Sequence, residues 1–245
     1  MHIYGNTILI TGGGSGIGLA LLRELYYEGN NIIATGRKEE TLQAMKKEFP
    51  NISTLQCDIF NPEDVDALID TCRKAFKGIN IFVCNAGIQQ MYAQQRNDVQ
   101  TSKYEHTESL KMTSPIRLIY GLIPLISKNN NPAIVLVSHG QKLSEENPPA
   151  VYRETEKAVQ NFSRWLRNQL TNQHIEVFEI VPPLSDAQLK KEGFESGISE
   201  EAIAKRFILD ATKGRHESNI GKSLIFQVVN SISPAISKFL WRARR

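Results

Sequence analysis

The chain has 245 residues, of which 41% are hydrophobic and 22% charged, so it can bury a full core without a covalent staple. Its 29 basic and 26 acidic residues leave a formal net charge of only +3, which argues against a nucleic-acid partner. The three cysteines include no CxxC spacing, and the five histidines show no ligand spacing. We therefore expect a reducing compartment, no disulfide framework and no metal.

Neither a basic region followed by a long apolar stretch nor an apolar run long enough to span a bilayer is present. We therefore expect a cytoplasmic protein without stable membrane insertion. The segment Ser223 to Trp241 is apolar with helical spacing and is followed by three arginines. We interpret residues 222–245 as a C-terminal amphipathic extension that packs on its own domain or on a second subunit, in preference to a membrane surface.

Short apolar runs alternate with amphipathic stretches along the chain. The runs are short and rich in β-branched residues, which predicts strands over Thr7–Ile10, Asn31–Ala34, Ile52–Leu55, Ile79–Val83, Ala133–Val137 and Ile175–Ile180. The stretches between them predict helices over Gly16–Glu28, Glu39–Glu48, Pro62–Phe76, Glu105–Ser127 and Val151–Thr171. This alternation predicts one α/β domain over residues 1–245, doubly wound, with a mainly parallel sheet and helices on both faces.

Three polar stretches follow predicted strands and interrupt the alternation. They cover Gln89–Lys103, Gln141–Pro149 and Pro182–Gly197. In open α/β sheets the loops at the carboxyl edge form the ligand pocket, so we expect these stretches to shape it.

A glycine-rich turn joins the first predicted strand to the first predicted helix. It reads Thr11-Gly12-Gly13-Gly14-Ser15-Gly16-Ile17-Gly18. Glycines let the backbone turn tightly and approach a diphosphate, whose charge is stabilised by exposed amides and the helix N-terminus. Because the turn follows a strand and opens a helix, it predicts a Rossmann-type NAD(P)-binding domain and disfavours a structural protein with an empty site.

The end of the second predicted strand indicates which cofactor is preferred. An acid at this point accepts bonds from the 2′-hydroxyl of NAD, whereas the 2′-phosphate of NADP requires a cation. The chain has Thr35-Gly36-Arg37-Lys38, with two cations and no acid. We expect Arg37 to contact the phosphate, and Lys38 either to join it or to be a solvated surface charge. NADP(H) is the predicted cofactor, and NAD(H) stays possible.

Three motifs in chain order carry a family resemblance. The spacing TGxxxGxG, Asp58 after the third strand and Asn85-Ala86-Gly87 after the fourth resemble the short-chain dehydrogenase/reductase family. The stretches CNAGIQ, IEVFEIVPPLSD and GISEE look especially like its DltE-type bacterial members. The resemblance implies a homodimer or homotetramer. The resemblance and the charge argument for Arg37 and Lys38 together give the predicted cofactor-binding residues: Gly12, Gly14, Ser15, Gly16, Ile17, Gly18, Arg37, Lys38, Asp58, Ile59, Asn85, Ala86, Gly87 and Pro182.

The same resemblance implies two catalytic residues. Family members place a Ser after the fifth strand and a Tyr on the following helix, and Ser138 and Tyr152 occupy these places. In that chemistry the Ser bonds the substrate oxygen, and the Tyr passes a proton while hydride moves to or from the nicotinamide.

One catalytic position departs from the family's pattern. The family places a Lys four residues after the Tyr, because a free Tyr has a pKa of about 10 and needs a cation to stabilise its phenolate. This chain has Glu156 there, followed by Lys157. Five residues along a helix turn a side chain about 140° away, so Lys157 does not replace the missing Lys. A carboxylate about 6 Å from the phenol costs the phenolate about 3 kcal/mol at an effective dielectric of about 20.

Two further positions differ. Lys111 stands where the family has a catalytic Asn, and Ala187 where it has a Thr that holds the nicotinamide amide. One interpretation is a swapped pair, in which Lys111 supplies the ammonium and Glu156 accepts bonds from the nicotinamide ribose. The other is drift after loss of catalysis.

Two functions follow from these observations. The first is an NADP(H)-dependent oxidoreductase acting on a small-molecule carbonyl or secondary alcohol, supported by the glycine turn, Ser138 and Tyr152. The alternative is a catalytically impaired NADP(H)-binding pseudoenzyme that acts as a sensor or scaffold, supported by Glu156 and Lys111.

Overall fold

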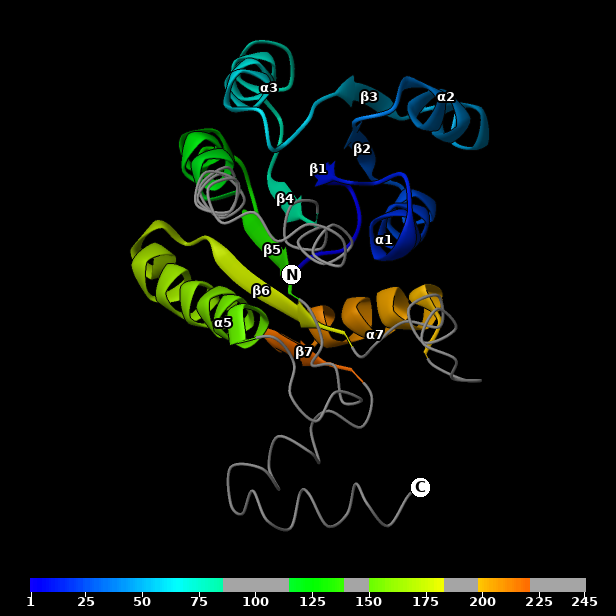
Figure 1. The fold of residues 1–245 in the computed structure, drawn as a ribbon. Helices are drawn as coiled ribbons and strands as arrows, with labels where there is room; N and C mark the ends of the chain where they lie inside the picture. The colour runs from blue at the N-terminus through cyan, green and yellow to red at the C-terminus, as the bar shows by residue number, and fades with distance from the viewer. Residues whose placement is uncertain (86–114, 139–149, 183–197, 221–245) are drawn as a thin grey trace, which may run out of the picture.

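The structure is a computed structural model that describes residues 1–85, 115–138, 150–182 and 198–220, with side chains for all of these except 150–157. Its elements are β1 (Thr7–Thr11), α1 (Gly16–Tyr27), β2 (Asn31–Gly36), α2 (Glu39–Glu48), β3 (Ser53–Gln56), α3 (Pro62–Ala75), β4 (Ile81–Cys84), a helix over 115–126, β5 (Ala133–Val137), α5 (Ala150–Leu170), a 3-10 turn (Thr171–Gln173), β6 (Glu176–Val181), α7 (Glu200–Thr212) and β7 (Glu217–Asn219). Figure 1 shows them in one α/β unit.

The strands form one parallel sheet in the order β3-β2-β1-β4-β5-β6-β7. This order confirms the predicted doubly wound fold. The chain moves outward from β1 to β3 and then returns to place β4 on the other side of β1, so Leu9 pairs with both Ile33 and Phe82. A reversal of this kind opens a crevice at the carboxyl ends of the two strands that flank it.

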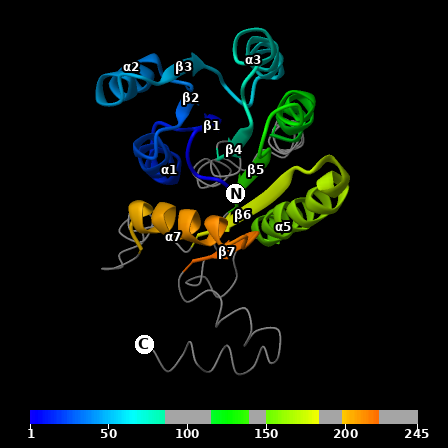
Figure 2. The same ribbon diagram turned by 180° about the vertical axis from the view of Figure 1, so that it is seen from behind.

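Helices cover both faces of the sheet (Figures 1 and 2). α1, α2 and α7 lie on one face, and α3, the helix over 115–126 and α5 lie on the other. Successive side chains of a strand point to opposite faces, so Ile8 and Ile10 belong to the first core and Leu9 to the second. Every residue of β4 and β5 is buried, which explains why these strands read as unbroken apolar runs.

The predicted strands all form, with boundaries that move by one or two residues. The prediction missed α7 and β7. Ser199 begins α7 by accepting a hydrogen bond from the Ala202 amide, and Glu200 and Glu201 fill its first turn, so a helix-start signal was present. β7 has the sequence ESN, which has little strand preference and forms through backbone pairing with β6.

Several predicted features lie outside the described residues: the first part of the helix over Glu105–Ser127, most of the three carboxyl-edge stretches, and the extension over 222–245. Within the described ranges, no helix combines the length and apolar character needed to cross a bilayer. Cys57, Cys72 and Cys84 are buried and not disulfide-bonded, and burial raises the pKa of each thiol to about 12.

A ladder of asparagines closes the amino edge of the sheet. Asn80 donates from Nδ2 to Asn6 Oδ1 at 2.8 Å and to the Asn130 carbonyl at 2.9 Å, and its Oδ1 accepts from the Thr7 amide at 2.9 Å. Asn6 in turn donates to Asn30 Oδ1 at 3.0 Å. The ladder therefore joins the starts of β1, β2 and β4 through side chains whose polar groups are bonded.

Replacing Asn80 by Ala should lower the free energy of unfolding by about 3 kcal/mol, because three partners lose bonds worth about 1 kcal/mol each. Urea denaturation of both proteins measures the difference. The control is Gln43→Ala on the exposed face of α2, whose effect should stay within about 0.5 kcal/mol. A loss at Asn80 no larger than that of the control would contradict the role of the ladder.

Candidate active site

The glycine turn lies at the reversal point of the sheet, directly after β1. The amides of Gly12 and Gly13 donate to the Thr35 carbonyl at 3.0 and 3.3 Å, which fixes the start of the turn against β2. Gly12 and Gly16 have φ angles of 66° and 55°, in the left-handed region that favours glycine. The predicted glycine positions thus include two that the backbone conformation itself requires.

The N-terminus of α1 lacks the groups that usually neutralise a helix start. Ser15 is the N-cap residue, but its side chain makes no capping hydrogen bond, and the first turn contains no acid. By contrast, α2, α3 and α7 each have two acids in the first turn. The positive end of the α1 dipole is therefore available to an anion.

Asn85 ties β4 to the glycine turn. Its Nδ2 donates to the carbonyls of Thr11 at 3.2 Å and Gly12 at 3.1 Å, and its amide donates to Thr11 Oγ1 at 3.1 Å. Its Oδ1 is buried without a donor in the described part of the chain, so it can accept from a bound hydroxyl group. A Cβ at Gly18 would overlap the Gly12 carbonyl and reach within 2.5 Å of Asn85 Nδ2, so the helix must carry glycine here.

Gly18→Ala should therefore displace the glycine turn and weaken dinucleotide binding by about tenfold or more, which corresponds to about 1.4 kcal/mol. Fluorescence titration with NADPH measures the change. Gly78→Ala is the matched control, because a Cβ there meets Thr7 Oγ1 at an ordinary 3.6 Å. Unchanged affinity in a folded Gly18→Ala protein would show that the turn does not hold the ligand.

Arg37 and Lys38 follow β2, at the same edge as the glycine turn. Both are exposed, and Gln56 Nε2 fixes the local backbone by donating to the Arg37 carbonyl at 2.9 Å. The guanidinium of Arg37 has no hydrogen bond or ion pair within the described residues. The other arginines with described side chains all donate to a carboxylate or a carbonyl: Arg23, Arg73, Arg117, Arg164, Arg167, Arg206 and Arg215.

Asp58 and Ile59 follow β3 at the same edge. Asp58 Oδ1 accepts from the Phe60 amide at 3.0 Å, and the Asp58 amide donates to Asp64 Oδ2 at 2.8 Å. These bonds fix a half-buried carboxylate whose acceptor sites are not all occupied. Ile59 is buried and packs in the core on the α3 side.

Ser138 lies at the end of β5 and is fully buried. Its hydroxyl donates to the Ile180 carbonyl at 3.0 Å, and its amide donates to the same oxygen at 2.9 Å. A serine has one hydroxyl proton, so it can donate to a substrate only if it turns away from Ile180. Pro182 is buried directly after β6.

Tyr152 and Glu156 lie in the first turns of α5, a continuous helix from Ala150 to Leu170. Their spacing is thus one helical turn, as predicted, and Lys157 lies about 140° from Tyr152 around the axis. α5 packs against β6, on the face of the sheet opposite α7 (Figure 1). The predicted site residues Ala86, Gly87, Lys111 and Ala187 lie outside the described residues.

The residues described contain no cluster of three or more His, Cys, Asp or Glu side chains able to hold a metal ion. The site does contain an acid that the sequence analysis missed. Glu179 of β6 is 1% exposed and lies one residue before the carbonyl that Ser138 uses. The two glutamates of IEVFEI are three residues apart, so they point to opposite faces of the strand, and the spacing alone does not indicate which of them a helix covers.

The parallel sheet reverses beside a glycine turn, next to a helix N-terminus without acids and a cation that has no partner in the described part of the chain. These features define a dinucleotide-binding α/β protein. The family can be named more closely. The family model for short chain dehydrogenases matches residues 6–196, and the chain belongs to this family.

Individual relatives agree with this assignment. The chain is 33% identical over 223 residues to the uncharacterized oxidoreductase DltE of Bacillus subtilis strain 168, covering 89% of this chain and 88% of that protein, which confirms the DltE-type resemblance. A short chain dehydrogenase from Burkholderia cenocepacia J2315 in complex with NADP superimposes with a TM-score of 0.77 at 20% identity, covering 96% and 97% of the chains. One from Burkholderia phymatum in complex with NAD gives 0.74 at 16% identity, covering 93% of each chain.

Proposed function

We propose that the protein is an NADP(H)-dependent oxidoreductase that interconverts a carbonyl and a secondary alcohol on a small molecule. The observation that supports the cofactor preference is the exposed guanidinium of Arg37, which follows β2 at the edge of the glycine turn and has no partner among the described residues. Solved relatives of the same fold carry NADP in one case and NAD in another, so the preference must come from this chain's own charges.

The described residues fit such a cofactor. The exposed amides of the glycine turn and the N-terminus of α1 would hold the diphosphate, and Arg37, with Lys38 next to it, would hold the 2′-phosphate. The free acceptor sites of Asp58 suit the amino group of adenine, and Asn85 Oδ1 suits a ribose hydroxyl. Ala86, Gly87 and Pro182 would continue this surface toward the nicotinamide.

When bound, the nicotinamide supplies or accepts a hydride at the substrate carbon. The chain's part is to move the proton. Tyr152 would give a proton to the carbonyl oxygen as the alcohol forms, and take one back in the reverse direction. Ser138 would hold the same oxygen after its hydroxyl turns away from Ile180.

A pseudoenzyme is the second candidate, and the regular geometry of α5 favours it. Because the helix has no break, Glu156 occupies the position where a cation would stabilise the Tyr152 phenolate, and Lys157 is about 140° from Tyr152 around the helix axis. Catalysis then requires another cation, and a swapped pair with Lys111 is the arrangement that we propose for an active enzyme.

Arg37→Ala should weaken NADPH binding about 10- to 100-fold, because a charge-assisted bond to phosphate contributes about 1.5–3 kcal/mol. Binding of NADH should change by less than about twofold, since it lacks the 2′-phosphate. Parallel fluorescence titrations measure both affinities, with Arg117→Ala, whose side chain pairs with Asp66 on the α3 side, as the control. Equal losses for the two cofactors would refute the assignment of Arg37.

Turnover of NADPH with a panel of aldehydes and ketones, and of NADP with secondary alcohols, separates the two candidate functions. In an active enzyme Tyr152→Phe should lower kcat about 100-fold or more, since it removes the proton donor. Lys111→Ala should lower it as well if the swapped pair operates.

A pseudoenzyme gives the opposite pattern: no turnover in the wild type and a gain in Glu156→Lys. Glu154→Lys makes the same charge change two residues earlier in α5 and is the control. Gain in both variants would point to a general effect of charge.

A further inference from the structure

Glu179 is a buried acid that the proposed reaction does not use. It lies on β6, in register with Leu136 of β5 and Glu217 of β7. Its neighbours Phe178 and Ile180 belong to the core on the α7 side, so the side chain of Glu179 points to the α5 side together with Val177. Its Oε1 is buried and has no hydrogen-bond partner in the described ranges.

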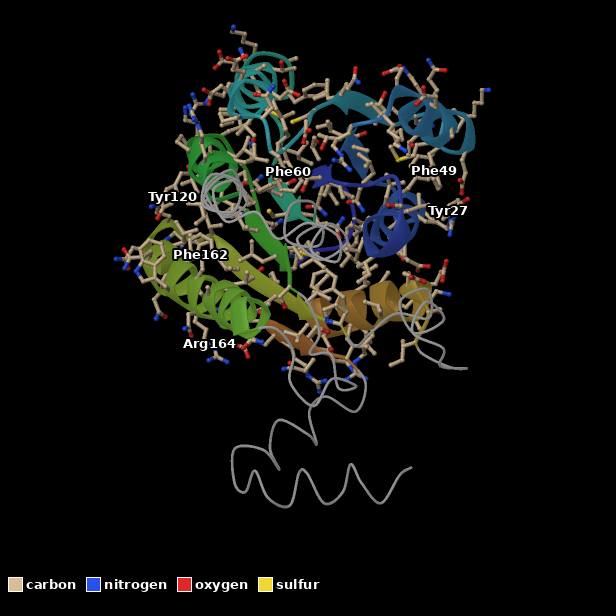
Figure 3. All side chains as sticks on the ribbon, in the orientation of Figure 1. Tyr27, Phe49, Phe60, Tyr120, Phe162 and Arg164 are labelled. Atoms are coloured by element: carbon tan, nitrogen blue, oxygen red, sulfur yellow. The ribbon has the colours of Figure 1, made fainter. Side chains whose placement is uncertain are left out.

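The arginines near Glu179 are paired with another acid, Glu217. From the described part of α5, Arg164 Nε and Arg167 Nη1 both approach Glu217 Oε1, at 3.2 and 3.4 Å (Figure 3 labels Arg164). From the β7 side, the His216 carbonyl accepts from the Glu179 amide at 2.8 Å, and His216 Nδ1 is buried without a partner among the described residues. No cation is therefore paired with Glu179 within these elements.

Two hydroxyl groups lie next to the carboxyl group. Ser163 of α5 is fully buried, and its Oγ has no hydrogen bond to any described residue. Ser138 has already given its proton to the Ile180 carbonyl, so its oxygen can only accept. Ser138 thus offers only an acceptor site, which a protonated carboxyl group can fill, whereas the unbonded hydroxyl of Ser163 can donate to the other oxygen of that group.

We propose that Glu179 is a positioning residue whose neutral carboxyl group donates a hydrogen bond to Ser138 Oγ and accepts one from Ser163 Oγ, and thereby links the end of β5 to the helix that carries Tyr152. A charged carboxylate at this point would be buried without a paired cation among the described residues, which is far more costly than a neutral group. Burial raises the pKa of Glu179, and a hydrogen bond from the Ser163 hydroxyl offsets only part of this rise; the charge of Glu217 adds to the rise, while Arg164 opposes it.

Glu179 and Glu217 face each other in register but should respond to pH with opposite signs. Because the pKa of Glu179 is raised, the folded protein holds a proton that the unfolded chain releases. The contribution of Glu179 to stability is therefore lost as pH rises from the ordinary glutamate pKa of about 4.3 toward the pKa in the folded protein. The two arginines lower the pKa of Glu217 against the opposing effect of burial, so its contribution is present above about 4.3 and lost as pH falls below it.

Thermal unfolding between pH 4.5 and 8.5 tests this contrast in the full chain. Glu179→Gln keeps a neutral donor of the same shape, so it should match the wild type near the low end and exceed its Tm by about 2–4 °C near pH 8. Glu217→Gln is the matched control and should fall below the wild type near pH 8. A Glu179→Gln curve that runs parallel to the wild type, or that falls below it near pH 8, would overturn the proposal.

The positioning role has a separate readout, which rests on the proposed function. Glu179→Leu fills the space without a donor and should lower kcat about tenfold, while the KM for NADPH changes by less than about twofold. Glu179→Gln should retain the wild-type kcat. Equal kcat values in the Leu and Gln variants would refute the positioning role of Glu179. A wild type without turnover would refute only the proposed reaction, and the pH dependence of unfolding would then test the protonation of Glu179.

Discussion

A single amide side chain connects the two strands between which the sheet reverses. Asn85 holds the Thr11 and Gly12 carbonyls from the end of β4, so the glycine turn cannot move without moving β4. In a buried site such bonds are stronger than in water, and losing one would leave a polar group unpaired. The close approach of Gly18 depends on the same bonds, because a displaced Gly12 carbonyl would change the space above the helix. Cofactor binding and sheet packing therefore share one constraint.

The electrostatics of the carboxyl edge of the sheet depend on two positive groups that have no acidic partner among the described residues, Arg37 and the N-terminus of α1. Paired arginines elsewhere on the surface contribute little stability individually, but pairing does satisfy their donors. Arg37 has no such partner among the described residues, and it lies at the same sheet edge as a helix start without an acid. Two positive groups near one another repel until an anion binds between them. This repulsion lowers the stability of the protein without a ligand and favours the binding of a ligand that carries separate phosphates.

The sequence predicted those parts of the fold that depend on local pattern. β1, β2, β4 and β5 are mostly apolar and rich in β-branched residues, and the helices over Glu39–Glu48 and Pro62–Ala75 begin and end close to the predicted residues. β7 could not be predicted, because its three polar residues form a strand through backbone bonds to β6. The glycine turn could be placed between β1 and α1 from chain order alone, and the roles of this turn and of Arg37 in binding a cofactor stay predictions. Glu179 was missed because its burial depends on α5, which covers β6 from a distant part of the sequence.

The two edges of the sheet treat buried polar groups differently. At the amino edge the buried amides of Asn6, Asn30 and Asn80 bond to one another and to backbone groups. Among the described side chains, the buried atoms without a partner belong to other residues, which include Asn85 and Glu179. An unpaired buried polar atom lowers stability, so it persists where a ligand or a protonation state gives it a partner. We propose that a ribose hydroxyl supplies this partner to Asn85 and that Glu179 supplies its own by keeping its proton. The buried amides at the amino ends of β1, β2 and β4 are thus bonded within the fold, whereas Asn85, after the carboxyl end of β4, keeps an acceptor for a ligand.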